Sequence, residues 1–204
     1  MKSTCLALAI VGFCLSMHIH AQSNSEEWKL KLEKSGVSVY MRAVAGSKIR
    51  ESKAEAKIQA SVDELTGLYL NPEKCASWFP SCKTAKLLEQ KSESNLVVYR
   101  EISIPWPFKN QEYVLNQEIS RTAESGEVIV TFNILKDYPT GTKCCKRYRS
   151  MKGSWTFTPA ANHVLVTYQV HFVPAGSFPA SAINSEIPGM LVEALTSLQA
   201  NVGI

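Results

Sequence analysis

The sequence predicts an α+β fold in which a curled antiparallel β-sheet is followed by one long C-terminal α-helix. Six segments between residues 84 and 174 alternate apolar and polar side chains, most clearly in residues 128–134 and 164–172. This alternation is typical of a sheet with one dry face and one wet face. Residues 181–202 instead place apolar side chains at helical spacing. A sheet that curls around such a helix leaves a space between them, which is a common place for a ligand cavity.

The first residues have the features of a secretory signal peptide. Lys2 precedes a short apolar run, and Ala21 provides the small residue that a signal peptidase requires. We therefore expect residues 1–21 to be removed and the protein to be exported, to a periplasm if the host has two membranes and otherwise to the medium. Residues 22–204, about 180 in number, suit one domain.

The formal net charge of the whole chain is +4. This balance is too even to suggest a nucleic-acid partner, although it allows a weak, transient attraction to anionic membrane surfaces. No serine nucleophile motif, phosphate-binding loop or dinucleotide-binding glycine pattern is present in the sequence. We therefore expect no catalytic residues, no cofactor and no metal, and a monomer is the expected state.

The expected elements follow one another without a linker. Residues 24–36 predict a short helix, because acidic residues precede Trp28 and Gly36 ends the run. Residues 37–44 and 49–60 predict a strand pair, and Ser61 with Glu64 predicts a capping box that opens the next helix. The remaining expected strands are 84–91, 95–104, 112–122, 126–135, 146–159 and 163–174.

Four cysteines follow the predicted cleavage site: Cys75, Cys82, Cys144 and Cys145. An even number in an oxidising compartment predicts disulfides, and of the three possible connectivities a local Cys75–Cys82 bridge is the easiest to close. Cys144 and Cys145 are awkward partners, since a bond between neighbours strains the peptide that joins them. Zinc is the alternative, but neither pair has the spacing of a zinc knuckle.

Pro105 and Pro107 interrupt two good strands and cannot donate hydrogen bonds to a sheet. They end the first strand and make Trp106 and Phe108 apolar anchors on a stiff loop. These two rings either plug the core or close the mouth of a cavity. The polar residues that follow, among them Gln111, are expected to form a hydrogen-bonded corner.

Two arginines in the expected strands lie an even number of residues from apolar side chains, so they should share a face of the sheet with them. Arg100 has the parity of Val98, and Arg149 has that of Trp155. A guanidinium that faces inward needs a partner, which could be Glu101, Glu112 or the anionic head group of a ligand such as a fatty acid or phospholipid. The alternative is that strand twist returns these arginines to solvent.

Four stretches, in order along the chain, resemble the START-domain family in its small exported bacterial form: "WKLKLEKSGVSVYMR", "YREISIPWPFKNQEYV", "RYRSMKGSWTFTP" and "PAGSFPASAIN". The resemblance implies the helix-grip fold, with a curved antiparallel sheet wrapped around the C-terminal helix and an internal hydrophobic cavity. One departure concerns Gln111 and Glu112, which stand where many members have arginine and aspartate.

The resemblance implies that the protein binds a lipid or another hydrophobic small molecule and carries it between membranes. Two alternatives remain open: a cyclase or hydratase that uses Glu112 or Glu101 beside Arg100, and an interaction module with a filled core. The loop 174–179 and the Trp106 loop are the expected gates. The residues expected to line the cavity are Arg100, Trp106, Phe108, Tyr113, Phe132, Arg149, Trp155, Tyr168, Phe172, Ile183, Met190 and Leu191.

Overall fold

Ten strands form one curved sheet, antiparallel except for the short β8 beside β6. The structure is a computed structural model that describes residues 27–203, so the predicted signal peptide lies outside the described residues. The spatial order is β1-β2-β3-β10-β9-β7-β6-β5-β4. The bounds are β1 (Lys29–Lys34), β2 (Val37–Val44), β3 (Ser47–Ile58), β4 (Cys82–Ser92), β5 (Asn95–Ile102), β6 (Gln111–Arg121), β7 (Val128–Ile134), β8 (Lys146–Arg147), β9 (Ser150–Pro159) and β10 (Val164–Val173).

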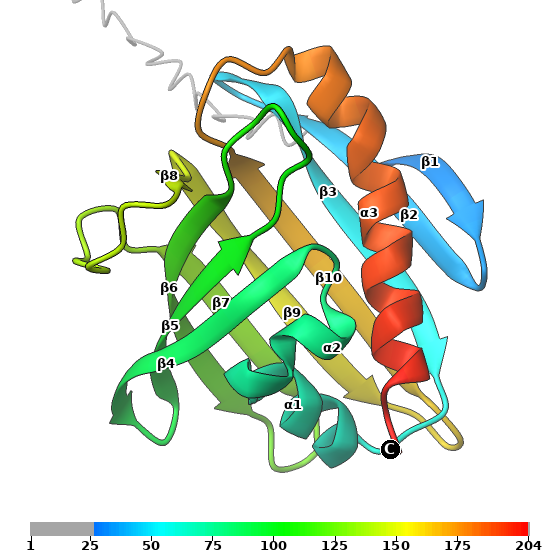
Figure 1. Cartoon of the computed structure of the whole chain (residues 1–204). Helices are drawn as coiled ribbons and strands as arrows, with labels where there is room; N and C mark the ends of the chain where they lie inside the picture. Colours follow the sequence, from blue (N-terminus) through cyan, green and yellow to red (C-terminus); the bar gives the residue numbers. More distant parts are fainter. Residues whose placement is uncertain (1–26, 204) are drawn as a thin grey trace, which may run out of the picture.

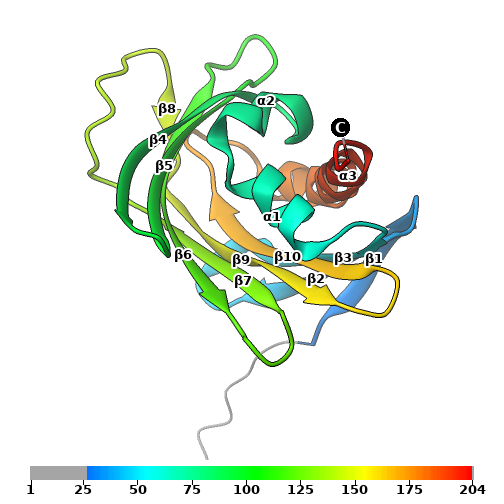
Figure 2. The same cartoon turned by 90° about the horizontal axis from the view of Figure 1, so that it is seen from below.

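Three helices lie on the concave face of this sheet (Figures 1 and 2). They are α1 (Val62–Leu70), α2 (Cys75–Trp78) and the long α3 (Ala180–Ala200), with a short 3₁₀ helix, η1 (Pro72–Lys74), between the first two. The expected α+β architecture, a curved antiparallel sheet around a C-terminal helix, is confirmed. None of the helices in the described residues is long and apolar enough to cross a bilayer.

The expected helix at residues 24–36 is wrong over its described part, because Lys29–Lys34 form β1. Leu30 and Leu32 are two apart, which is also the spacing of a strand, and β1 pairs with β2 in antiparallel register. The guanidinium of Arg42 lies 4.4 Å from the centre of the Trp28 ring, and Lys53 lies on the same ring. Trp28 therefore packs on cations of the neighbouring strands.

The beginning of α1 is as expected. The Ser61 side chain accepts a hydrogen bond from the Glu64 amide, and the Glu64 carboxylate accepts one from the Ser61 amide. The helix ends at Leu70, with Asn71 as the cap residue before the proline of η1, and it buries Leu65 and Tyr69. Reciprocal capping satisfies two amides that the first turn leaves free, so these residues determine where the helix begins.

The disulfides are Cys75–Cys82 and Cys144–Cys145. The first confirms the expected local bridge and joins α2 to the start of β4. The second joins chain neighbours, the pairing that had seemed awkward, and it lies in the loop before β8.

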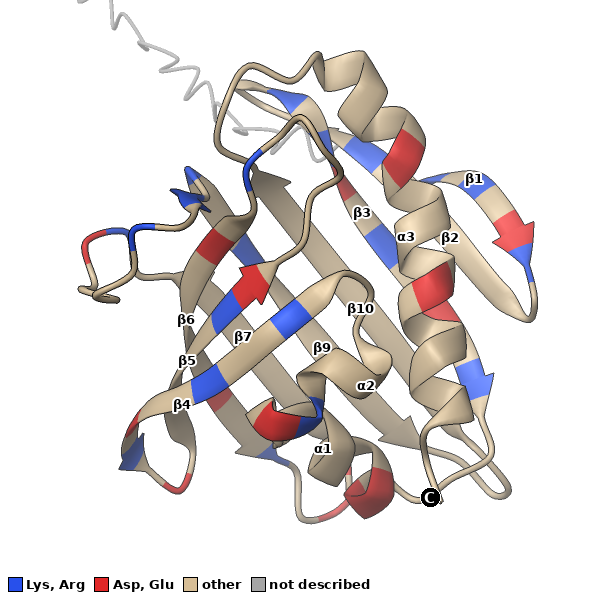
Figure 3. Cartoon of the chain, in the orientation of Figure 1, with Lys and Arg blue, Asp and Glu red and all other residues tan. Residues whose placement is uncertain are grey.

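The two edge strands are irregular and charged. β1 shifts register once against β2, and β4 shifts register three times against β5. Lysine segments stand out in blue on both strands in Figure 3. The interior strand β10 pairs with both β3 and β9 without such shifts.

Replacing Gly153 with alanine is expected to destabilise the sheet by about 1–3 kcal/mol. A Cβ at this position would lie 2.1 Å from the carbonyl oxygen of Gln169 and 2.7 Å from Cζ of Phe132. A matched control is Gly67→Ala in α1, where a Cβ meets nothing within 4 Å. Chemical denaturation should show a loss for Gly153→Ala and a small gain for Gly67→Ala. An unchanged Gly153→Ala midpoint would contradict the packing of Phe132 on this glycine.

Candidate ligand-binding site

An apolar groove of about 210 Å³ opens between the beginning of α3, the end of β10 and the loop 174–179. Its walls are almost entirely apolar, with Gln111 and Glu186 as the polar exceptions. The residues that line it are Ile104, Gln111, Tyr148, Phe172, Pro174, Phe178, Ala182, Ile183, Glu186 and Met190. Such a groove offers an apolar chain a surface from which water is displaced.

A smaller cavity of about 40 Å³ lies deeper, between α3 and β10. Its lining residues are Phe79, Pro80, Tyr168, Val170, Phe172, Ile187, Met190, Leu191 and Ala194. Phe172 and Met190 border both spaces, so their side chains form the partition. Each space is smaller than the roughly 300–1,000 Å³ of an ordinary small-molecule site. A lipid therefore fits only if this partition moves.

Two side chains, Gln111 and Arg149, hold the loop 174–179 beside the groove. Gln111 Oε1 accepts a hydrogen bond of 3.0 Å from the Ala175 amide, and Gln111 Nε2 donates to the Ala175 carbonyl at 3.4 Å. Arg149, exposed on the outside, donates to the Gly176 carbonyl at 3.0 Å. Gln111 thus acts as a neutral clamp that both donates to and accepts from the backbone of the expected gate.

The proline-rich loop projects its aromatic residues outward. The Trp106 side chain is 92% exposed and does not line the groove. Phe108 is 55% exposed, and its ring centre lies 4.8 Å from that of Phe178, which does line the groove. The Trp106–Pro107 peptide is cis. The loop is therefore an apolar rim beside the mouth, not a plug of the core.

Several of the expected lining residues fill the core instead. Trp155 is 1% exposed and stacks on Tyr168 with ring centres 4.1 Å apart. Phe132 and Tyr113 are also buried in the same apolar cluster, away from the groove lining. Of the twelve predicted residues, the structure brings Phe172, Ile183 and Met190 to the groove and Tyr168 and Leu191 to the deeper cavity.

Arg149 and Ile183 also border a separate hollow of about 250 Å³ at the β2–β3 turn. Its other wall is formed by Gly46, Ser47 and Lys48. The guanidinium of Arg149 therefore faces the outside of the gate loop and not the interior of the sheet.

Arg100 lies inside the sheet, 4% exposed. Its guanidinium carbon is 5.1 Å from the centre of the Phe79 ring and 5.7 Å from that of Tyr69. The two acids next to it in the sheet, Glu101 and Glu112, follow the opposite parity and lie on the outer face. Among the described residues Arg100 forms no ion pair.

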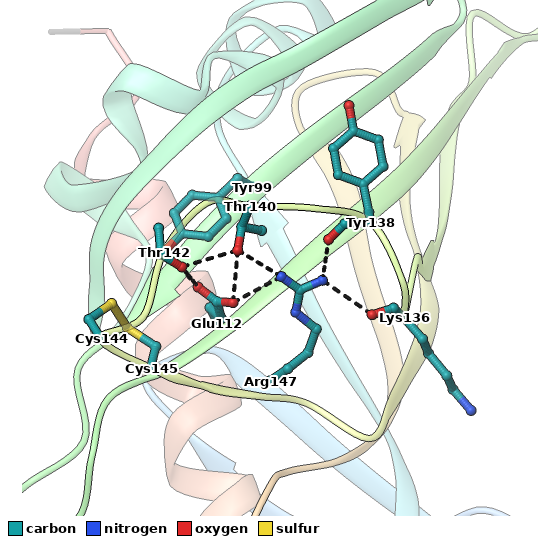
Figure 4. A network of polar contacts seen from close by, with 9 residues as sticks. All are labelled: Tyr99, Glu112, Lys136, Tyr138, Thr140, Thr142, Cys144, Cys145 and Arg147. Atoms are coloured by element: carbon teal, nitrogen blue, oxygen red, sulfur yellow. Dashed lines mark hydrogen bonds and ion pairs between the residues drawn. A yellow bond between two sulfur atoms is a disulfide. The ribbon is translucent and has the colours of Figure 1, made fainter.

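A polar network on the outer face is centred on Glu112 (Figure 4). Its carboxylate accepts hydrogen bonds from Tyr99, Thr140 and Thr142, and from the Arg147 guanidinium at 2.9 Å. The threonines belong to residues 136–146, which we call the strap because they cross over β5 and β6. Burial acts to raise the pKa of Glu112, but the hydrogen bonds from Thr142 and Arg147 outweigh it and keep the pKa below its ordinary value.

Glu101 has its own partners on the same face. Its Oε1 accepts from Lys83 at 2.9 Å and from Asn110 at 2.8 Å. The Lys83 hydrogen bond is the main reason that the pKa of Glu101 is lowered. An acid catalyst would need a carboxyl group that faces the cavity and has a raised pKa. Glu101 and Glu112 meet neither condition.

Sequence reasoning missed several residues at this site. Tyr148 and Phe178 line the groove, and Phe79 borders the deeper cavity. Phe178 lies within the loop 174–179, so its place in an expected gate was an available signal. Phe79 follows the two short helices, and only the folding of α2 onto α3 brings it to the cavity.

No family model matches the chain. An uncharacterised protein of Pseudomonas aeruginosa is 29% identical over 200 residues, which cover 98% of this chain and 95% of that protein. The mouse phosphatidylcholine transfer protein is 28% identical over 93 residues, 45% of this chain and 42% of that protein.

Lipid transfer proteins are also found among the solved structures that resemble this one. A STAR-related lipid transfer protein from Xanthomonas axonopodis is 28% identical with a TM-score of 0.79, covering 86% of this chain and 98% of that one. An aromatase/cyclase from a Streptomyces species is more distant, at 13% identity and a TM-score of 0.53 over 74% of this chain and 92% of that one, and shows the fold alone. Together with the curved sheet and its helix, these likenesses show that the chain has the helix-grip fold seen in START-related lipid transfer proteins.

Proposed function

We propose that the protein binds a lipid or a similar hydrophobic molecule between its sheet and α3 and carries it between membranes. The observation that carries this proposal is the groove, which is lined by apolar side chains and bordered by a hydrogen-bonded loop. The names of the similar proteins, a STAR-related lipid transfer protein and a phosphatidylcholine transfer protein, support it.

Loading would begin when the partition of Phe172 and Met190 moves. Met190 is unbranched and 43% exposed, so its side chain can leave the groove without breaking packed core. Each methylene that enters contributes about 0.8 kcal/mol by leaving water. An acyl chain of ordinary length therefore offsets the loss of a few side-chain contacts. Release of the Gln111 clamp would widen the opening further.

The rim beside the groove is suited to a membrane surface. Trp106 and Phe108 are exposed on the loop beside the groove, where Lys109 follows Phe108, and Met190 is exposed on the wall of the groove. Tryptophan prefers the boundary between lipid head groups and acyl chains, and lysine is attracted to anionic lipids. We infer that the rim meets the bilayer while the groove accepts its ligand.

The direct test is native mass spectrometry of the protein purified gently from its own host, with organic extraction of the bound material. A stoichiometric lipid is the expected result. A purified protein that carries nothing, and that also fails to take up fluorescent fatty acids or phospholipids, would overturn the proposal.

Replacing Trp106 with alanine is expected to weaken binding to phosphatidylcholine–phosphatidylglycerol vesicles about tenfold, since the ring no longer enters the interface. Cosedimentation with vesicles and the rate of lipid transfer between vesicles are the measurements. The control is Leu30→Ala, which removes another exposed apolar side chain, on the edge strand β1. Equal losses for both variants would show that the rim has no special role.

We propose a non-catalytic role. The cyclase alternative requires an inward-facing acid, whereas Glu101 and Glu112 are paired with Lys83 and Arg147 on the outer face. We further propose that the protein is exported after cleavage near Ala21 and acts as a monomer. Its two disulfides support an oxidising compartment. Fractionation of host cells with N-terminal sequencing tests the location, and light scattering tests the state.

A further inference from the structure

Arg100 is a buried positive charge whose neighbours do not neutralise it. Its Nε has no hydrogen-bond partner among the described residues, and it forms no ion pair there. The faces of the Tyr69 and Phe79 rings lie on the guanidinium and compensate only part of the charge. A buried charge without a counter-ion is costly, so natural proteins rarely keep one without a use.

The two acids that could have paired with Arg100 are engaged elsewhere. Glu101 binds Lys83, and Glu112 binds Arg147, both on the outer face of the sheet. Either acid would have to cross its own strand to reach the guanidinium. Arg100 therefore has no counter-ion among the described residues.

The polar groups around Arg100 are neutral phenols, and the Tyr113 oxygen is a hydrogen-bond acceptor for the guanidinium. The hydroxyls of Tyr113 and Tyr168 lie near the guanidinium, and Tyr69 accepts from Gln117 at 2.9 Å, which leaves its own proton free to donate. Burial raises the pKa of Tyr69 to about 12 and also raises the pKa values of Tyr113 and Tyr168, so these phenols stay protonated. Trp78 Nε1 is a further buried donor without a partner among residues 27–203.

We propose that the ligand carries an anionic oxygen group, a carboxylate or a phosphate, which Arg100 binds inside the sheet with help from the surrounding phenols. A guanidinium can donate two parallel hydrogen bonds to either group, which gives affinity and a fixed orientation. The proposal rests on the proposed function, because it names the class of lipid that the same interior takes.

A path to Arg100 leads through the spaces already described. Phe79 lies against the guanidinium and also borders the deeper cavity, together with Tyr168. Phe172 and Met190 separate that cavity from the groove. A ligand that enters with its anionic group first places that group at Arg100 and leaves its apolar tail between β10 and α3.

The experiment compares matched ligands that differ only in charge. Oleic acid is paired with oleyl alcohol, and lysophosphatidic acid with monoacylglycerol, and each competes with a fluorescent fatty acid for the protein. The wild type should bind at least one acid about 10–100-fold more tightly than its neutral partner, the range expected for a hydrogen-bonded charge pair. The better acid identifies carboxylate or phosphate as the preferred group.

Arg100→Met should abolish this preference while neutral ligands still bind. A buried charge replaced by an apolar side chain of similar length commonly leaves a protein folded. The control is Arg121→Gln, which removes an exposed guanidinium at the end of β6, away from the groove, and should keep the preference. If Arg100→Met does not fold, Arg100→Lys serves instead. Lysine retains the charge but cannot donate two parallel hydrogen bonds. The preference for the acid over its neutral partner should then decrease but remain measurable.

Three results would overturn the inference. Wild-type protein could bind acids and neutral partners equally, Arg100→Met could keep the preference, or inorganic phosphate alone could bind as tightly as lysophosphatidic acid. In the first two cases the lipid-binding proposal stands and only the head-group assignment fails. If no ligand binds, charged or neutral, the proposed function itself fails.

Discussion

Replacing Glu112 with alanine is expected to lower the free energy of unfolding by about 3 kcal/mol, the lower end of the range for breaking a buried ion pair. The variant removes the acceptor of four side-chain donors and leaves Arg147 without its carboxylate. The loss stays at the lower end because Arg147 still donates to the carbonyls of Lys136 and Tyr138. The strap should then detach from β5 and β6.

Chemical denaturation measures the loss, and hydrogen exchange over residues 136–146 measures the detachment. Glu118→Ala is the matched control, since Glu118 is an exposed acid on the same strand and its change should stay within about 0.5 kcal/mol. Arg147→Met and the double variant complete a cycle that isolates the pair. A loss no greater than that of Glu118→Ala would contradict the role of Glu112 as the anchor of the strap.

The same anchor predicts a dependence on pH. The folded-state pKa of Glu112 is lowered, so its contribution is fully present above the unfolded-state value near 4.5 and is lost as pH falls through the folded-state value. Wild-type protein should therefore lose stability on acidification below that value. Glu112→Gln should lose less over the same interval, and the two curves should converge in acid. Parallel curves would show that Glu112 does not titrate with folding.

Replacing Trp155 with alanine is expected to cost about 3–5 kcal/mol, because a fully buried indole leaves a void that its neighbours cannot fill. The ring stacks on Tyr168 and also lies 5.1 Å from Tyr69 between ring centres. These aromatic neighbours are themselves held by the sheet and α1, so little collapse is possible. The expected void adjoins the deeper cavity through Tyr168.

Denaturation midpoints with and without oleic acid provide the measurement. Trp106→Ala is the control for stability, since that ring is 92% exposed and its loss should change the midpoint little. The ligand should restore more stability to Trp155→Ala than to wild type, because an apolar chain can occupy the enlarged interior. A loss below about 1 kcal/mol would show that the core around Trp155 relaxes freely.

The strand content of the fold follows from local patterns, whereas β1 depends on a distant partner. Alternation over residues 128–134 and 164–172 corresponds to β7 and β10 because one face of each is buried in the core. β1 buries almost nothing, so its short run of Leu30 and Leu32 fits a helix or a strand equally well. Pairing with β2 and the stacking of Arg42 on Trp28 decide the outcome, and neither is visible in a local window.

Strand parity placed Arg100 on the inward face, but it left open whether Glu101, Glu112 or a ligand is its partner. Thr140 and Thr142 donate to Glu112 from the strap. The strap is irregular, so no repeating pattern in the sequence predicts its path. The sequence also could not show which inward-facing side chains line a cavity and which fill the core. Trp155 and Phe172 both face inward, and only the helices above them decide which side chain remains beside a space.

The irregular edge strands have a consequence for how the protein behaves at high concentration. An open sheet offers unpaired backbone groups at both margins, and a neighbouring molecule could extend it strand by strand. Register shifts in β1 and β4 break the even spacing that such an extension requires, and lysines such as Lys86 repel an identical edge. A protein whose sheet stays open and is not closed into a barrel is in this way protected from fibrous self-assembly.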